Sequence, residues 1–143
     1  MKMYEVSKEF EIDYAHRLLG YDGDCARIHG HRAKIIVVVR SEELNAEWMV
    51  VDFKDIKAAM ENILNMFDHR LLVNQDDPII PHLGKGEKFV FSDLTDGRNP
   101  KGINPTAEVV ANTIFHALED KGFPVSRVEF WETPGAKAAY YED

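Results

Sequence analysis

Two strand-type patterns lie within the first 41 residues, and their closeness in the chain constrains the fold more than any other feature. From Tyr4 to Tyr14, apolar side chains alternate with polar ones, which is the period of a strand with one buried face. Residues 35–39 are all isoleucine or valine, within a second segment, 33–41, and β-branched residues favour strands. The loop between the two segments, residues 16–32, is punctuated by glycine. We therefore predict two strands that pair as a hairpin.

A helix-type spacing of three and four residues appears twice after residue 50. Asp52 is predicted to cap the first helix, and Asn104 followed by Pro105 to cap and begin the second. Gly122 and Pro124 are expected to end the second helix. The predicted apolar faces are Phe53, Ile56, Met60, Ile63, Leu64 and Phe67 in the first helix, and Val109, Val110, Thr113, Ile114, Ala117 and Leu118 in the second.

Two more strands are predicted after the helices, at residues 127–131 and 136–140. The order ββααββ has no βαβ crossover pattern, so we expect an α+β fold with a four-stranded antiparallel sheet and two helices on one face. The extended segment at residues 73–103 is the least clear part of the chain. A loop of that length without structure is unusual, so its apolar patch at residues 89–91 is expected to form a short strand or a partner contact.

Length and charge narrow the class of protein. A chain of 143 residues fits one domain, residues 1–143, and the apolar run 35–39 is too short to span a membrane. The N-terminal residues lack the apolar core of a secretory signal, and a single cysteine, Cys25, fits a reducing compartment. The net charge of −8 is the wrong sign for a general nucleic-acid binder. We expect a cytoplasmic protein that binds neither membranes nor nucleic acid.

The charge is unevenly distributed along the chain. Residues 14–40 contain five Arg or Lys and two Asp, so this segment carries +3 while the rest of the chain carries −11. A locally basic segment in an acidic protein favours an anionic ligand there. Chance clustering of solvated side chains explains the same pattern equally well.

Three of the six histidines lie in the region of the first two strands. His29 and His31 are two residues apart and therefore share a face of a strand, and His16 reaches the same face if the strands pair as a hairpin. Three neutral imidazoles can bind Zn²⁺ and leave its fourth position open, which is typical of a catalytic zinc site. The spacing alone also arises by chance, and the metal could be another divalent ion.

Cys25 lies four residues before His29, and three roles are open for it. Near zinc and Arg27 it could be a thiolate base or nucleophile. It could instead be a fourth zinc ligand, which would close the site, or a small packed side chain.

Carboxylates provide further candidates. Asp68 is followed by His69, and a carboxylate can orient an imidazole and raise its basicity for acid–base chemistry, although a cation at a helix C-terminus explains the pair too. Glu132, at the end of the third predicted strand, could bind a guanidine-like edge of a ligand through both oxygens. Glu108 lies in the first turn of the second helix, where the helix dipole already explains a carboxylate.

Six short motifs occur in order over nearly the whole chain. They are Tyr14-Ala15-His16, Cys25-Ala26-Arg27-Ile28-His29-Gly30-His31, Val51-Asp52-Phe53, Asp68-His69, Pro105-Thr106-Ala107-Glu108 and Trp131-Glu132-Thr133. With them, the chain resembles the 6-pyruvoyl-tetrahydropterin synthase / 6-carboxytetrahydropterin synthase family. The resemblance implies a T-fold (tunnelling fold) in which oligomerisation, commonly to a homohexamer, forms a barrel.

The resemblance also implies roles for particular residues. His16, His29 and His31 would bind zinc, and Cys25 would be the general base. Asp68 with His69 would provide the second acid–base group, in this family often from a neighbouring subunit. Glu132 would anchor the 2-amino-4-oxo edge of a pterin, with support from Thr106 and Glu108.

The activity implied by the resemblance is a lyase reaction on 7,8-dihydroneopterin triphosphate. We favour the branch of the family that forms 6-carboxy-5,6,7,8-tetrahydropterin with release of acetaldehyde and triphosphate, on the route to queuosine. The alternatives are the pyruvoyl branch, a non-catalytic zinc-stabilised binding protein in which Cys25 ligates the metal, and a generic zinc hydrolase. The triphosphate would account for the basic segment. The residues at 73–103 depart from shorter family members and could form a lid, an edge strand or a subunit contact.

Overall fold

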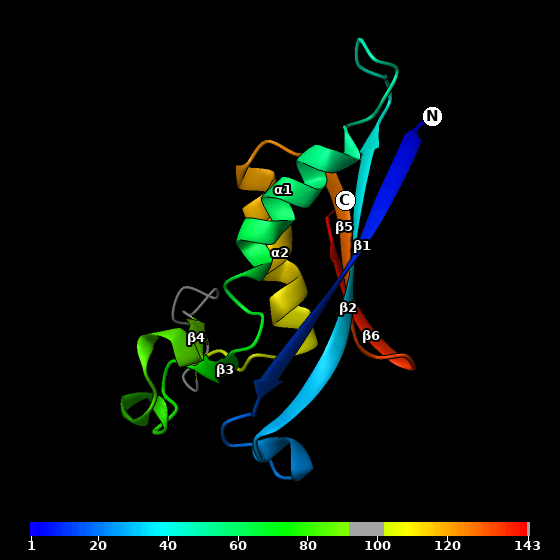
Figure 1. The fold of residues 1–143 in the computed structure, drawn as a ribbon. Coiled ribbons are helices and arrows are strands. Elements are labelled where there is room, and N and C mark those ends of the chain that lie inside the picture. The colour runs from blue at the N-terminus through cyan, green and yellow to red at the C-terminus, as the bar shows by residue number, and fades with distance from the viewer. Residues whose placement is uncertain (92–101, 143) are drawn as a thin grey trace.

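The computed structural model describes residues 1–91 and 102–142, which form a twisted sheet with two helices packed on one face (Figure 1). Long, strongly twisted strands at the N-terminus form the centre of the sheet, and the two helices lie side by side across it. The elements are β1 (Tyr4–His16), β2 (His29–Ser41), α1 (Phe53–Leu64), β3 (Leu71–Asn74), β4 (Lys88–Phe91), α2 (Ala107–Asp120), β5 (Val125–Thr133) and β6 (Ala136–Tyr141).

The strand order within the sheet is β4-β3-β1-β2-β5-β6. The pairs β1–β2, β2–β5 and β5–β6 are antiparallel, so the four predicted strands, their pairing and the α+β class are confirmed. The structure adds β3 and β4, which run parallel to β1 and to each other. The described sheet is therefore mixed and six-stranded, and the predicted order ββααββ lacks two strands. A strand of four residues, like β3, is too short to show a period in the sequence.

Strand β4 confirms the short strand expected at residues 89–91. It extends the sheet beyond β3, and Phe89 and Phe91 pack on Phe67, which follows α1. Of the extended segment at residues 73–103, residues 92–101 lie outside the described residues. Among the described residues, no helix is both long and apolar enough to cross a membrane.

The core lies between the helices and the covered face of the sheet. The predicted face of α1 is buried except for Phe53, which is exposed. The buried face of α2 is shifted from the prediction. Val110, Ile114 and Leu118 are buried as expected, but Ala111 and Phe115 are buried as well, whereas Val109, Thr113 and Ala117 are only partly buried. Burial of a side chain of this size contributes about 1.5–3 kcal/mol, so this interface is the main source of stability. The sheet residues that complete the core are Ile12, Tyr14, Ala33, Ile35, Val37, Val39, Leu72, Phe91, Val128 and Phe130.

The helix caps agree with the sequence at one helix and differ at the other. Asp52 caps α1 by accepting a hydrogen bond from the backbone N–H of Lys54. The prediction that Asn104 caps α2 and Pro105 begins it was wrong. The helix begins at Ala107, and Thr106 is the N-cap, whose side chain accepts from the N–H of Val109. The Asn104 side chain instead binds the backbone of a distant loop, so the next residue with a side-chain oxygen becomes the cap.

Candidate active site

Pairing of β1 with β2 brings the three histidines together. His16 is opposite His29 and Tyr14 is opposite His31, so all four side chains share one face of the sheet. The His16 ring centroid lies 4.6 Å from that of His29 and 5.2 Å from that of His31. One ring nitrogen from each histidine lies within 4.8 Å of the other two. The hairpin predicted from the sequence therefore produces the predicted cluster.

Hydrogen bonds fix which nitrogen of two of these rings is free. Nδ1 of His16 lies 2.7 Å from the carbonyl oxygen of Pro105, and Nδ1 of His29 lies 2.7 Å from that of Arg27. A carbonyl only accepts, so each Nδ1 carries the hydrogen and each Nε2 keeps its lone pair. Burial lowers the pKa of His16, which favours the neutral imidazole that metals bind. Such backbone bonds orient metal-ligating histidines, and the donor set fits zinc with an open position.

Gly30 allows the end of β1 that carries His16 and the start of β2 that carries His29 and His31 to lie close together. A Cβ on this residue would lie 2.9 Å from the carbonyl oxygen of Tyr14 in the facing strand. No side chain fits there without a shift of the backbone, so the Gly between His29 and His31 is a geometric requirement of the site.

Glu132, from the end of β5, lies beside the histidines. Its Oε1 is 3.4 Å from the hydroxyl of Tyr14, which donates, and 3.7 Å from Nε2 of His16. Burial, together with the Glu132 charge, raises the pKa of Tyr14 well above its usual value, so its hydroxyl keeps the proton it donates. Tyr14 is not among the predicted site residues, because its place in an alternating strand already explains it as a core residue.

The histidines line a cavity of about 330 Å³ that also contains most of the other predicted site residues. Cys25 enters it from a short 3-10 helix, Asp24–Ala26, and is exposed. Thr106 and Glu108 enter from the start of α2. The full lining is His16, Leu18, Cys25, His29, His31, Thr106, Ala107, Glu108 and Glu132.

Asp68 and His69 lie outside this cavity. Oδ1 of Asp68 accepts from the N–H of Asp13 at 3.0 Å and lies 3.0 Å from Nδ1 of His69. The adjacent side chains can meet because His69 adopts φ 60°, a turn conformation. His69 lines a second cavity, which shares no lining residue with the histidine cavity. Within one chain, the predicted acid–base pair therefore does not meet Cys25.

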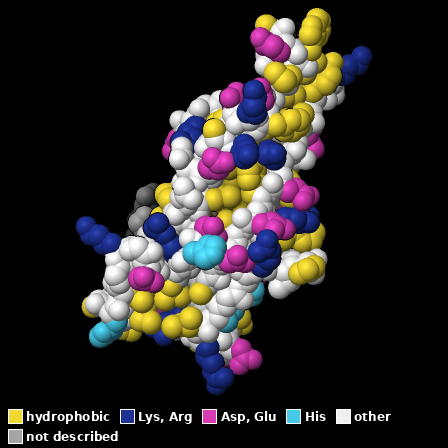
Figure 2. All heavy atoms as spheres, viewed as in Figure 1, with side chains coloured by type: hydrophobic (Ala, Val, Ile, Leu, Met, Phe, Trp, Pro, Cys, Tyr) yellow, Lys and Arg dark blue, Asp and Glu magenta, His cyan; other side chains and the backbone are white. Residues whose placement is uncertain are grey.

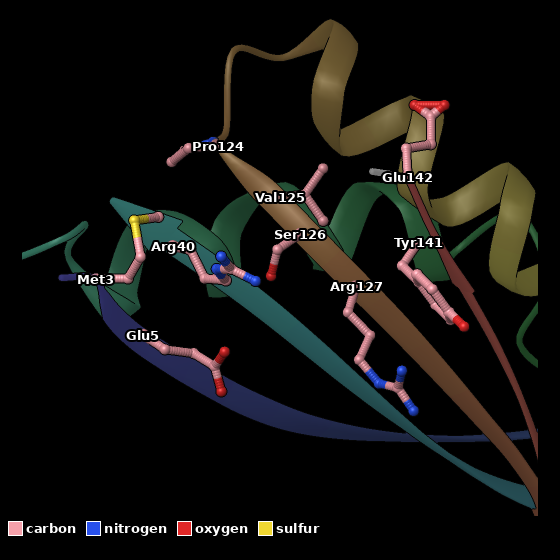
Figure 3. A pocket seen from close by; sticks show the side chains of 9 residues that line it. All are labelled: Met3, Glu5, Arg40, Pro124, Val125, Ser126, Arg127, Tyr141 and Glu142. Atoms are coloured by element: carbon pink, nitrogen blue, oxygen red, sulfur yellow. The ribbon is translucent and has the colours of Figure 1, made fainter. Parts of the chain in front are cut away.

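Another cavity, of about 490 Å³, lies where β1 begins and β6 ends (Figure 3). Arg40, Arg127 and Tyr141 point into it, but none of the predicted site residues does. The histidine side chains visible in Figure 2 all lie in the lower half of that view, and apolar side chains gather both at its upper end and at its lower left. The larger of these two cavities is therefore not the one that contains the predicted site residues.

The basic segment is only partly available to an anion. Arg17 forms a two-point ion pair with Asp77, whose side chain is fully buried. Arg32 pairs with Glu11 and Asp13 on the uncovered face of the sheet. Among the described residues, the other basic side chains of the segment, Arg27, Lys34 and Arg40, have no carboxylate within 4.0 Å. The partner Asp77 lies 60 residues from Arg17, so no local pattern indicates this pair.

Comparison with known proteins identifies the family. The family model described as 6-pyruvoyl tetrahydropterin synthase matches residues 5–143. The chain belongs to this family. It is 32% identical to the 6-carboxy-5,6,7,8-tetrahydropterin synthase of Haemophilus influenzae over 149 aligned positions, which cover 98% of this chain and all of the relative.

Solved structures of 6-pyruvoyl tetrahydropterin synthase family members and similar proteins show the same fold. An uncharacterized protein from Wolinella succinogenes has a TM-score of 0.80 and 25% identity, with full coverage of both chains. The 6-pyruvoyl tetrahydropterin synthase of Caenorhabditis elegans has a TM-score of 0.72 and 23% identity, covering all of this chain and 98% of that one. The expected T-fold and the resemblance are thus confirmed, and the chain is an enzyme of the lyase type that this family represents.

Proposed function

We propose that the protein is a zinc-dependent 6-carboxy-5,6,7,8-tetrahydropterin synthase that acts on 7,8-dihydroneopterin triphosphate in the cytoplasm. The observation that carries the proposal is one cavity lined by three histidines, whose ring nitrogens lie within 4.8 Å of one another, together with Cys25 and Glu132. The relatives from Haemophilus influenzae and Aquifex aeolicus that bear this name match 98% of the chain, which supports the carboxy branch. The product would serve queuosine biosynthesis.

Glu132 and Thr106 would hold the pterin ring. A carboxylate accepts two parallel hydrogen bonds from the 2-amino group and the neighbouring ring N–H of a pterin, in the geometry of an arginine–carboxylate pair. The Glu132 oxygen nearer Tyr14 is kept in place by the tyrosine hydroxyl. Thr106 accepts a hydrogen bond as the cap of α2 and keeps its own hydroxyl hydrogen for a ligand oxygen. Glu108 at the cavity rim would support the ring.

His16, His29 and His31 would hold the zinc, which when bound polarises the side-chain oxygens of the substrate and acidifies the adjacent C–H and O–H groups. Cys25 as a thiolate would then take a proton from the substrate side chain. Cleavage between the first and second side-chain carbons leaves a carboxyl group on the ring, and the other two carbons leave as acetaldehyde. The oxidation of the first carbon is balanced within the substrate, because the C=N bond of the dihydropterin ring is reduced to the tetrahydro level and the terminal carbon becomes a methyl group as it loses triphosphate. Water supplies the second carboxyl oxygen, and triphosphate departs. Arg27, exposed beside Cys25, is available to bind the triphosphate.

The second acid–base group would come from another subunit. The Asp68–His69 pair and the Cys25 cavity do not meet within one chain. The outer edge of β6 and most of the outer edge of β1 have no neighbouring strand among the described residues. Copies that pair these two edges head to tail would close a ring and remove both edges. We propose that a homohexamer built in this way completes each site with His69 of a neighbouring copy.

A second candidate is the pyruvoyl reaction, which the description of the matching family model favours. It eliminates triphosphate and keeps all three side-chain carbons on the ring. The fold, the metal site and the pterin anchor would be the same in both reactions. Acetaldehyde in the products therefore separates the two.

The test combines turnover with metal content. Zinc-loaded wild-type protein is expected to release acetaldehyde from 7,8-dihydroneopterin triphosphate. The Cys25→Ala variant is expected to keep one zinc per chain and to lose turnover, because only the base is removed. A matched control is His82→Ala, an exposed histidine outside the cavity, which should behave as wild type. Loss of zinc in Cys25→Ala would instead make Cys25 a metal ligand and favour the non-catalytic binding protein.

A further inference from the structure

Asn104 lies just outside the histidine cavity, yet its side chain is hydrogen-bonded to the loop that carries Cys25. We propose that Asn104 is the positioning residue for Cys25, holding the loop of residues 17–27 so that the thiol faces the histidine triad. The inference rests on the proposed function for its catalytic consequence. Its structural content, the control of Cys25 by Asn104, is measurable without the pterin.

The contact is a two-point clasp on one residue of the loop. Oδ1 of Asn104 accepts from the backbone N–H of Leu19 at 2.8 Å, and Nδ2 donates to the carbonyl of Leu19 at 3.1 Å. The side-chain amide thus satisfies both backbone groups of Leu19, as a neighbouring strand would. Asn104 is half-buried, and the two segments it joins are 85 residues apart in the sequence. This explains why Asn104 does not cap α2.

One backbone hydrogen bond connects Cys25 to the segment that Asn104 holds. The backbone N–H of Leu18 donates to the carbonyl of Cys25 at 2.8 Å, which closes the loop on itself. The N–H of Leu19 is held by Asn104, and Arg17 is held by the ion pair to Asp77. Residues 17 and 19 are therefore each held from outside the loop, and Cys25 is hydrogen-bonded to residue 18, which lies between them. Leu18 itself lines the cavity beside Cys25.

The same short segment also orients the metal site. Pro105, the residue after Asn104, accepts the hydrogen bond from Nδ1 of His16. Thr106, the next residue, lines the cavity and caps α2. In this segment, Asn104 contacts the Cys25 loop, Pro105 contacts His16, and Thr106 lines the cavity. This arrangement sets the position of Cys25 relative to His16 through one piece of backbone.

Asn104 is itself held by a buried neighbour. Nδ2 of Asn74, a fully buried residue at the end of β3, donates to Oδ1 of Asn104 at 3.0 Å. Oδ1 of Asn104 therefore accepts two hydrogen bonds, which fixes the orientation of its amide. Gly102 lies against Asn74, and a Cβ there would come 2.5 Å from the Asn74 side-chain oxygen. The clasp is part of a packed network and not a surface contact.

The variant that tests the proposal is Asn104→Ala, compared with Asn45→Ala. Asn45 is the matched control, because its side chain also accepts two backbone N–H hydrogen bonds, from Glu47 and Met49, in a loop outside the cavity. In zinc-loaded protein, Asn104→Ala is expected to lower kcat by about 10- to 100-fold, as displaced catalytic groups do, with KM within about threefold and one zinc per chain retained. Asn104→Asp keeps the acceptor for Leu19 and should lie between Asn104→Ala and wild type. Asn45→Ala should match wild type.

A second readout needs no substrate. Cys25 is the only cysteine in the chain, so the rate of iodoacetamide alkylation reports on this thiol alone. In Asn104→Ala, the alkylation rate of Cys25 and the backbone hydrogen exchange of residues 17–27 are both expected to rise relative to wild type and to Asn45→Ala. A merely general loss of stability would raise exchange throughout the sheet as well, whereas the proposal confines the change to this loop.

The outcomes separate the two proposals. If wild-type protein shows no turnover of the pterin, the proposed function fails, and alkylation with hydrogen exchange decides the role of Asn104. Unchanged alkylation and exchange in Asn104→Ala overturn the positioning role whatever the activity. With an active wild type, a kcat within twofold of wild type in Asn104→Ala also overturns it, and so does a loss of kcat that tracks loss of zinc.

Discussion

At the scale of single residues, a variant of Glu132 tests whether this carboxylate binds the pterin or the metal. Its Oε1 lies 3.7 Å from Nε2 of His16, close to where the metal would bind. We expect Glu132→Gln to keep one zinc per chain, because three histidines already provide the ligand set. Loss of a charge-assisted hydrogen bond of about 1.5–3 kcal/mol should weaken neopterin binding by about 10- to 100-fold. Fluorescence titration with neopterin and metal analysis measure both quantities, and loss of zinc would place Glu132 among the metal ligands.

The ion pair between Arg17 and Asp77 makes a prediction about pH. The Arg17 guanidinium holds the pKa of Asp77 below its usual value near 3.8, so folding favours the charged carboxylate. This stability is present above about pH 4 and is lost as the pH falls through the lowered pKa. Asp77→Asn should therefore cost about 3 kcal/mol at pH 7, since it leaves a partly buried cation unpaired. The difference from wild type in the free energy of unfolding should shrink below pH 4, and a constant difference from pH 3 to 7 would contradict this account.

The candidate residues that the sequence could reveal are those whose chemistry is local or periodic. The spacing of His29 and His31, with His16 at the facing strand end, was sufficient to predict the triad. Tyr14, Asp77 and Asn104 were missed, because each acts through a contact with a residue 60 or more positions away. No pattern within a window of the sequence records such contacts.

At the scale of elements, the β1–β2 hairpin and Gly30 position the three histidines that we propose as metal ligands. Gly30→Ala would place a Cβ 2.9 Å from the Tyr14 carbonyl and push the two strand ends apart. We expect a loss of about 1–3 kcal/mol in stability, as for other overpacked sites. Zinc affinity should fall too, because His29 and His31 flank the shifted residue. Gly135→Ala, at a turn where a Cβ meets nothing within 4 Å, is the control. Equal zinc affinity in the two variants would contradict the role of Gly30.

The elements themselves were predictable where a pattern extended over several residues. Both helices, β1 and β5 carry clear periods, β2 contains a run of β-branched residues, and the apolar patch at residues 89–91 indicated β4. Strand β3 was not predictable, because four residues are too few to show a period. Its place in the sheet depends on pairing with β1 at two positions and with β4. The cap of α2 was misplaced because tertiary hydrogen bonds, and not the local preference of Asn, determine the use of Asn104.

At the scale of the whole molecule, the separation of the two cavities predicts that activity needs more than one chain. Cys25→Ala and His69→Ala should each be inactive alone. Subunits mixed at random after dissociation and reassembly should recover about one quarter of wild-type activity, because one shared site in four then has both residues. Steady-state turnover of the mixed oligomers measures this. Absence of recovery in verified mixed oligomers would mean that both residues act within one chain.

The measurement that tests the central claim most directly is a full product analysis. Zinc-loaded protein is incubated with 7,8-dihydroneopterin triphosphate, and the products are identified by mass. The account predicts acetaldehyde and 6-carboxy-5,6,7,8-tetrahydropterin in equal amounts, together with triphosphate. A pyruvoyl pterin without acetaldehyde would assign the protein to the other reaction of its family, and no turnover with zinc bound would contradict the proposed enzyme.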